Sequence, residues 1–210
     1  NFFPPENLQV VSLIKEMEGL FRNIDLKSFT LIHFHDVVSL CAYLRVTPFQ
    51  PPPVLLTLHG YFAREALDYS GLHNERRKRK FFDFCSDIET KSMKSPQHII
   101  AVDNRIKVYI IEMYGIRENN VSVIFNAVDT DQFAPVTKSE KDHKRESYSY
   151  GKNDLIVLIP RRLVPKNGVE HAIKALKQVK ADNVKLLIAG SGPLERELKI
   201  LSANDERIEF

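Results

Sequence analysis

The alternation of short apolar runs with amphipathic segments between residues 155 and 201 constrains the fold more than any other feature of the chain. Leu155–Ile159 is an unbroken apolar run, which suits a buried parallel strand. A second apolar run, Val184–Ala189, follows a segment in which apolar residues recur at helical spacing: Val169, Ala172, Ile173, Leu176 and Val179. A further helix carries Leu194, Leu198 and Leu201. Because strands and helices alternate, we predict a parallel sheet with crossover helices.

Two loops follow these strands, at the edge where open α/β sheets bind their ligands. The first loop is rich in cations, and cations near a helix N-terminus favour phosphate. Arg162 and Lys166 are therefore candidate ligands of a diphosphate, although such a loop can also be an ordinary solvated surface. The second loop contains Gly190 and Gly192, which allow a ligand to approach the backbone closely or simply precede a helix. No third glycine completes a dinucleotide-binding motif.

The first part of the chain shows the same alternation. We expect helices over residues 6–23, 37–45, 74–94 and 104–114, and strands over residues 30–34, 54–58, 98–102 and 121–125. Pro48 and Pro51–Pro53 interrupt the pattern, and Asp103 is placed to cap the helix that follows it. Residues 207–210 read as the start of another strand.

A polar, charged stretch separates the two α/β regions. We interpret residues 135–153 as a linker or a long surface loop, because they contain almost no apolar side chains. The expected domains are therefore residues 1–134 and residues 154–210. The chain starts without a methionine and stops inside an expected strand, so we expect a fragment in which both domains are incomplete.

Composition excludes several classes of protein. A hydrophobic content of 43% permits a full core, and a net charge of +3 does not indicate bulk nucleic-acid binding. No apolar run reaches the length of a transmembrane helix. Cys41 and Cys85 are far apart and lie among apolar residues, which predicts buried free thiols in a reducing compartment.

Histidines and aspartates follow strands of the first region. His59 comes directly after an expected strand, where it could contact a substrate hydroxyl, transfer a proton, or serve only in capping or packing. His33 and His35 share one strand face, but three close ligands are not evident, so we expect no metal. Asp129 and Asp131 could bind a divalent ion or form a turn.

A dense run of cations, Arg76–Lys80, precedes Phe81, Phe82 and Phe84. Consecutive cations on a helix point in all directions, so the run can be a solvated segment. The alternative is a basic surface that meets anionic lipid headgroups or an acidic acceptor.

Taken together, six segments resemble the retaining glycosyltransferases of family 4, which have the GT-B fold, and they occur in that family's order. The segments are Ile32–Asp36, Leu56–Gly60, Ile99–Asp103, Val123–Phe133, Arg162–Gly168 and Ala189–Leu194. The resemblance implies two Rossmann-like domains, with a nucleotide-sugar donor bound between an acceptor-side domain and a donor-side domain. It implies no cofactor and no metal, so Asp129 and Asp131 are interpreted as turn residues.

The resemblance also assigns roles to particular residues. Arg162 matches the family's arginine that holds the donor diphosphate, and Lys166 lies one position before the family's lysine, where this chain has Asn167. His59 matches a histidine near the transferred sugar, and Asn126, Gly190 and Gly192 are candidate donor-pocket residues. The family's N-terminal glycine-rich loop and its paired-glutamate motif are missing from residues 1–210, which fits truncation at both ends.

The leading hypothesis is a hexosyltransferase-type enzyme that moves a sugar, with retention of configuration, onto a glycan, lipid or small-molecule acceptor. The alternatives are a non-catalytic nucleotide-binding module, and a nucleotide-sugar epimerase or hydrolase with the same architecture. We expect a cytoplasmic protein without a nucleic-acid partner, with Arg76–Lys80 as its candidate peripheral contact at the inner face of the membrane.

Overall fold

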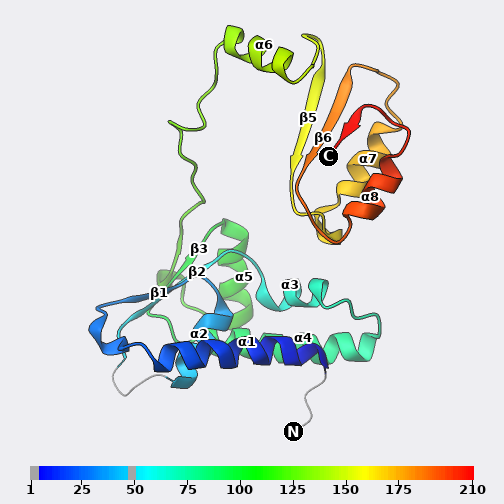
Figure 1. Ribbon diagram of the computed structural model, residues 1–210. Coiled ribbons are helices and arrows are strands. Elements are labelled where there is room, and N and C mark those ends of the chain that lie inside the picture. Colours follow the sequence, from blue (N-terminus) through cyan, green and yellow to red (C-terminus); the bar gives the residue numbers. More distant parts are fainter. Residues whose placement is uncertain (1–4, 47–50) are drawn as a thin grey trace. The chain divides into compact units, whose positions relative to one another are not determined.

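The computed structural model describes residues 5–46 and 51–210 (Figure 1). Pro48, which we expected to break the chain, lies outside the described residues. The chain divides into two compact units, Asn1–Val128 and Asp129–Phe210, which we describe separately as unit 1 and unit 2. This division falls earlier in the chain than the domain boundaries expected from the sequence.

Unit 1 contains a four-stranded parallel sheet in the order β1-β2-β3-β4. Its strands are β1 (Ile32–Phe34), β2 (Val54–Leu58), β3 (His98–Ala101) and β4 (Val121–Val123). All four lie where the apolar runs predicted them, although β1 and β4 are shorter than expected. Because neighbouring strands run in the same direction, their carboxyl ends meet at one edge of the sheet.

The helices of unit 1 are α1 (Pro5–Arg22), α2 (Val37–Val46), α3 (Phe62–Tyr69), α4 (Glu75–Met93) and α5 (Asn104–Tyr114), with short 3-10 turns at Leu26–Ser28 and Glu118–Asn120. These helices pack against the sheet or against one another: α2 and α5 contact strands, α1 packs on α2, and α3 packs on α4 (Figure 1). The sequence predicted all but α3. Asp103 caps α5 as expected, because its carboxylate accepts a hydrogen bond of 2.8 Å from the Ile106 N–H. The core includes the fully buried Ile14, Leu40 and Leu56.

Unit 2 contains a three-stranded parallel sheet in the order β5-β6-β7. Its elements are β5 (Leu155–Pro160), the 3-10 turn Pro165–Asn167, α7 (Val169–Leu176), β6 (Val184–Ala189), α8 (Glu195–Ser202) and β7 (Ile208–Glu209). Buried side chains of α7, α8 and β6, together with Leu163 of the loop after β5, form its core. The predicted strand–helix order of this segment is therefore confirmed.

The prediction that residues 155–159 form a buried strand is only half right. β5 is a parallel strand, but Leu155, Val157 and Leu158 are 59%, 42% and 57% exposed. Within the described sheet β5 pairs with β6 alone, and none of the buried core residues of unit 2 lies on it. An apolar run predicts a strand, but it cannot show how many neighbours that strand will have.

The expectation of a loop over residues 135–153 is wrong for its central part, where α6 (Lys138–Ser147) forms. Thr137 and Glu140 build a capping box: the Thr137 side chain accepts from the Glu140 N–H, and the Glu140 carboxylate accepts from the Thr137 N–H at 2.8 Å. No residue of α6 is buried, so the helix gives no apolar periodicity.

Both cysteines are buried and free, as the sequence predicted. Burial raises the pKa of the Cys85 thiol to about 12. A thiol in this state forms little thiolate at neutral pH, so Cys85 is suited to packing and not to nucleophilic chemistry.

Candidate functional site

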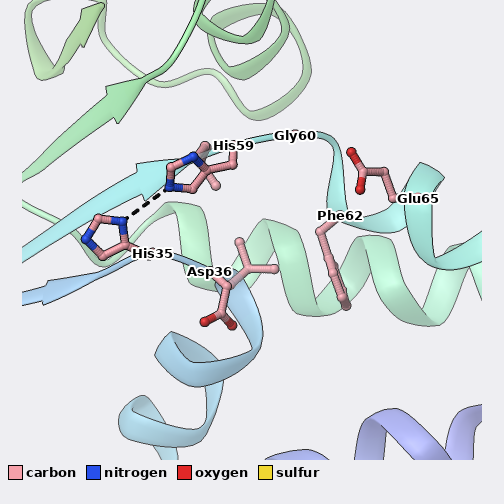
Figure 2. Close-up of a pocket in the computed structure, with 8 residues that line it drawn as sticks. His35, Asp36, His59, Gly60, Phe62 and Glu65 are labelled. Atoms are coloured by element: carbon pink, nitrogen blue, oxygen red, sulfur yellow. Dashed lines mark hydrogen bonds between the residues drawn. The ribbon is translucent and has the colours of Figure 1, made fainter. Parts of the chain in front are cut away.

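A small pocket lies at the carboxyl edge of the unit 1 sheet, where His35 follows β1 and His59 follows β2. The Nδ1 atom of His35 lies 3.2 Å from Nε2 of His59, and the two rings are stacked with centroids 5.6 Å apart (Figure 2). We call this site, lined by His35, Asp36, Val37, Leu58, His59, Gly60, Phe62 and Glu65, the histidine pocket. Its volume of about 200 Å³ is below the 300–1,000 Å³ typical of sites that enclose a drug-sized ligand, so it fits only a part of a nucleotide sugar.

The contact between His35 and His59 fixes which nitrogen atoms remain available. One of the two facing nitrogens must carry the hydrogen and the other must accept it. The Nδ1 atom of His59 takes no part in this contact, and whether it is a donor or an acceptor depends on the tautomer of the pair. This pairing could not be predicted from the sequence, since the two residues are 24 positions apart.

His33 supports the pair from the neighbouring position on β1. Its Nε2 atom hydrogen-bonds the Thr57 hydroxyl at 2.7 Å, and its ring centroid lies 4.3 Å from that of His35. Desolvation, followed by repulsion from His35, lowers the pKa of His33, which favours a neutral ring. In residues 5–46 and 51–210, no group of three or more histidine, cysteine or acidic side chains is placed to hold a metal ion.

Two carboxylates line the histidine pocket, and they differ in role (Figure 2). Asp36 caps α2, because its carboxylate oxygens accept from the Ser39 N–H and hydroxyl, each at 2.7 Å. Glu65, in the first turn of α3, lies against Gly60, where any β-carbon would collide with its carboxylate. Glu65 was not predicted from the sequence, where its signal is no more than an acidic residue shortly after the His59-Gly60 pair.

The cationic loop of unit 2 connects β5 to α7. The Asn167 side-chain amide donates a 2.7 Å hydrogen bond to the Arg162 carbonyl, which closes the loop between these residues. The Arg162 and Lys166 side chains are exposed at this edge, at the carboxyl end of β5. Gly168, with φ of +63°, adopts the left-handed conformation that glycine tolerates and joins the 3-10 turn to α7.

The glycine loop lies directly against the cationic loop. Leu163 donates to the Ser191 carbonyl at 2.9 Å, and Leu194 donates to the Leu163 carbonyl at 3.1 Å. A β-carbon at Gly190 would collide with the Arg161 carbonyl, and one at Gly192 would lie 2.5 Å from the Leu163 carbonyl oxygen. The close contact between the two loops therefore explains why glycine occupies both positions, independently of any ligand.

The remaining predicted residues lie apart from these sets. Asn126 is exposed in the segment after β4. The Asp129 carboxylate accepts from the N–H groups of Asp131 and Gln132, both at 3.0 Å, so Asp129 is the turn residue that we expected. The structure thus brings Arg162, Lys166, Gly190 and Gly192 to one edge of unit 2, while His59 lies in unit 1.

Comparison with known proteins decides the family. The family model described as Glycosyltransferase Family 4 matches residues 1–132, and the model described as Glycosyl transferases group 1 matches residues 140–207. The chain belongs to glycosyltransferase family 4. The two matches cover unit 1 and most of unit 2, as the resemblance of the sequence segments predicted.

Curated relatives are similar over most of this chain. An uncharacterized glycosyltransferase of Methanocaldococcus jannaschii is 24% identical over 90% of the chain, which covers 47% of that protein. The UDP-Gal:alpha-D-GlcNAc-diphosphoundecaprenol alpha-1,3-galactosyltransferase of Escherichia coli is 24% identical over 94% of the chain and 50% of its own length. The chain therefore spans about half the length of these relatives.

Solved structures show the fold. Sucrose-phosphate synthase from Thermosynechococcus elongatus matches with a TM-score of 0.73 and 18% identity, over 100% of this chain and 52% of that one. The Anabaena protein HepE, in complex with UDP-glucose, matches with a TM-score of 0.62 and 17% identity, over 99% and 53% of the two chains. The α/β architecture with parallel sheets is that of GT-B glycosyltransferases, as expected. None of the helices that the structure describes is long and apolar enough to cross a membrane.

Proposed function

We propose that the whole protein transfers a sugar from a nucleotide-diphosphate donor to a glycan, lipid or small-molecule acceptor, with retention of configuration. The observation that carries the proposal is the cationic loop at the carboxyl end of β5 in a chain of glycosyltransferase family 4. The complex of the similar Anabaena protein with UDP-glucose supports a nucleotide sugar as the donor.

Arg162 and Lys166 would bind the donor diphosphate. A guanidinium can hold two phosphate oxygens at once, and an ammonium adds a point charge. When the bond between sugar and diphosphate breaks, negative charge grows on the leaving diphosphate. Cations that are already in place stabilise this charge and so lower the barrier to transfer. No metal is needed for this part of the chemistry.

His59 would act on the sugar. The pairing with His35 leaves its Nδ1 atom for a sugar hydroxyl or for a group near the anomeric carbon. The size of the histidine pocket suits a single sugar ring better than a nucleotide. Glu65 adds a carboxylate that can accept hydrogen bonds from sugar hydroxyls.

The diphosphate role is tested by Arg162→Ala in the whole protein. We expect the affinity for nucleoside diphosphates, measured by titration calorimetry, to fall about tenfold or more, because a charge-assisted hydrogen bond is lost. Lys180→Ala, which removes another exposed positive charge from unit 2, is the matched control and should leave the affinity nearly unchanged. Equal affinity of Arg162→Ala and the parent protein would rule out the diphosphate role.

The same preparation separates sugar transfer from its alternatives. Release of the nucleotide only when an acceptor is present, with the sugar found on that acceptor, indicates a transferase. Release without an acceptor indicates a hydrolase, and a changed sugar on an intact nucleotide indicates an epimerase. Tight nucleotide binding without any turnover would show a binding module and would contradict the proposal.

We also propose that the start of α4 contacts an anionic membrane surface. Arg76, Arg79 and Lys80 are exposed there, in the first turns of a helix. The N-terminal end of a helix dipole repels cations, so helix stability does not explain their placement. Anionic lipid headgroups attract such a cluster by roughly 1 kcal/mol for each cation near the surface.

Co-sedimentation with vesicles tests this contact. Replacement of Arg76, Arg79 and Lys80 by glutamine should weaken binding to vesicles that contain phosphatidylserine several-fold, and should not affect binding to phosphatidylcholine vesicles. Glutamine at Lys138, Lys141 and Lys144 of α6 removes the same charge from another exposed helix and is the control. If both triple variants sediment like the parent protein, the membrane contact is absent.

A further inference from the structure

Helix α3 begins without a cap from its own sequence. Its N-cap residue, Tyr61, makes no side-chain hydrogen bond to the helix. The first N–H groups of any helix lack partners inside the helix, and a serine, threonine or aspartate at the N-cap usually supplies one. The partner of the first turn of α3 must therefore come from elsewhere.

Glu89 of α4 supplies it. The two oxygens of its carboxylate accept hydrogen bonds from the Phe62 N–H at 3.1 Å and from the Ala63 N–H at 3.2 Å. The Tyr114 hydroxyl also hydrogen-bonds this carboxylate, and Tyr109 lies 3.0 Å from Tyr114, oxygen to oxygen. Glu89 is completely buried, so these groups replace the water that a carboxylate loses on burial.

Burial of the Glu89 carboxylate lowers the stability of the folded protein, so a role beyond stability is needed to explain it. A buried carboxylate without a directly bonded cation loses more solvation free energy than most hydrogen bonds return. The N-terminal end of the α3 dipole and two N–H donors offset part of that loss. A neutral cap at Tyr61 would serve helix stability alone at a lower cost.

The segment that Glu89 fixes is a wall of the histidine pocket. Phe62, whose N–H it binds, lines the pocket, and His59 lies three residues earlier in the chain. The Tyr61 ring packs edge-to-face on Tyr109 with centroids 4.7 Å apart, which holds the connecting turn from the same side. Gly60 lies against Glu65, so the turn and the first turn of α3 are in contact.

We propose that Glu89 is a positioning residue of the histidine pocket: its carboxylate fixes the start of α3 and thereby sets the position of His59 and Glu65. Its effect on turnover rests on the proposed function. Its effect on the conformation of His59 does not, and can be measured without a substrate.

The alternative is that Glu89 serves only the stability of unit 1, since it also lies near the small apolar cluster of Ala63, Phe81 and Cys85. A structural residue would change the stability of unit 1 and leave the His59 ring undisturbed. Cys85→Ala is the matched control, because Cys85 is equally buried, lies one turn earlier on α4 and belongs to this cluster.

The first experiment follows the imidazole resonances of His59 by NMR in the whole protein, assigned with a His59→Gln variant. Glu89→Gln keeps the size of the side chain but places an amide N–H against a backbone N–H, so one of the two cap bonds is lost. We expect its His59 resonances to shift or broaden, and those of Cys85→Ala to stay as in the parent protein. Unchanged His59 resonances in Glu89→Gln would overturn the proposal.

A milder variant keeps the test valid if Glu89→Gln does not fold. Tyr114→Phe removes only the hydroxyl that supports the carboxylate, so it should move the His59 resonances in the same direction by a smaller amount. If neither variant moves them, Glu89 does not position His59.

Turnover is measured in parallel. We expect Glu89→Gln to lower kcat about tenfold, with a smaller change in the KM for the donor, because a misplaced catalytic group costs more in the transition state than in binding. Cys85→Ala should retain kcat at a matched folded fraction. Equal losses in both variants would overturn the positioning role. Moved resonances in a protein that transfers no sugar would leave the positioning role standing and reject only the proposed function.

Discussion

Glu89 in unit 1 and Asp205 in unit 2 are carboxylates that hold elements together, and burial and charge act on their pKa values in opposite directions. In unit 1, Glu89 is fully buried, and desolvation raises its pKa in spite of its hydrogen bonds. In unit 2, the Asp205 side chain is 12% exposed and lies 2.8 Å from an Arg207 nitrogen. Hydrogen bonds from that guanidinium lower the pKa of Asp205.

The difference lies in the partner and not in the number of hydrogen bonds. Arg207 brings a full positive charge to Asp205, whereas Glu89 receives mainly backbone and hydroxyl dipoles. The Arg64 guanidinium also lowers the pKa of Glu89, but it lies over the Tyr61 and Tyr109 rings. Asp205 therefore serves the stability of its unit, whereas Glu89 has a desolvation cost that its role in setting the geometry of the pocket explains.

Among the variants that test the contrast between Asp205 and Glu89, Arg207→Ala is expected to change local stability most. The Arg207 guanidinium also donates to the carbonyls of Leu176, Val179 and Ala181, at 3.1, 2.6 and 3.2 Å, and so ties the end of α7 to β7. Its loss removes the guanidinium donors from the Val179 and Ala181 carbonyls, while Asp205 keeps only the backbone N–H of residue 207 and the Leu176 carbonyl keeps the Val179 N–H. We expect amide hydrogen exchange in β6 to accelerate about tenfold or more, as measured by mass spectrometry.

Arg196→Ala is the control, because it removes an exposed arginine from α8 of the same unit. Its β6 amides should exchange like those of the parent protein, and the β2 and β3 amides of unit 1 should change in neither variant. If Arg207→Ala left the exchange of β6 unchanged, the stabilising role of the Asp205–Arg207 pair would be wrong.

The same contrast explains how much of the fold could be predicted. The helices α7 and α8 follow from the periodicity of apolar residues and β6 follows from its apolar run, because each of these elements buries side chains of its own. β5 follows from its apolar run alone, although none of its side chains is fully buried. Helix α3 was missed because its cap, Glu89, lies 27 residues from Phe62 in sequence. Helix α6 could have been found: Thr137 and Glu140 have the spacing of a capping box, but a helix without buried residues has no apolar stripe to draw attention to it.

The candidate site divides in the same way. Arg162, Lys166 and the two glycines lie in the loops that directly follow β5 and β6. The positions of the strand ends and the composition of the loops were therefore enough to predict these residues. The environment of His59 is made by contacts between distant segments: His35 is 24 residues away, and Glu65 lies on the helix that was missed. Single-sequence reasoning finds a residue type at a strand end, but the partners that define its chemistry come from tertiary structure.

The smallest expected effect is the change with pH in the contribution that each carboxylate makes to the free energy of unfolding. It also compares the two carboxylates most directly. The pKa of Asp205 is lowered from its ordinary 3.8, so the unfolded chain binds its proton more readily, and the contribution of Asp205 to stability is lost as the pH falls below about 4. The pKa of Glu89 is raised from its ordinary 4.5, so the folded chain holds that proton longer. Its contribution to stability is therefore largest at low pH and falls as the pH rises above about 4.5.

Asp205→Asn and Glu89→Gln isolate these two contributions, because all other titrating groups cancel when each variant is compared with the parent protein. The range from about pH 3 to about pH 7 covers the titration of both carboxylates. Over this range, the difference in free energy of unfolding between the parent protein and Asp205→Asn should grow with rising pH. The difference between the parent protein and Glu89→Gln should shrink. Local exchange in β6 for the first variant and in the amides of α3 for the second measures each contribution in its own unit. If both stability differences changed with pH in the same direction, burial would not outweigh the hydrogen bonds in setting the pKa of Glu89. The contrast between the two carboxylates would then disappear.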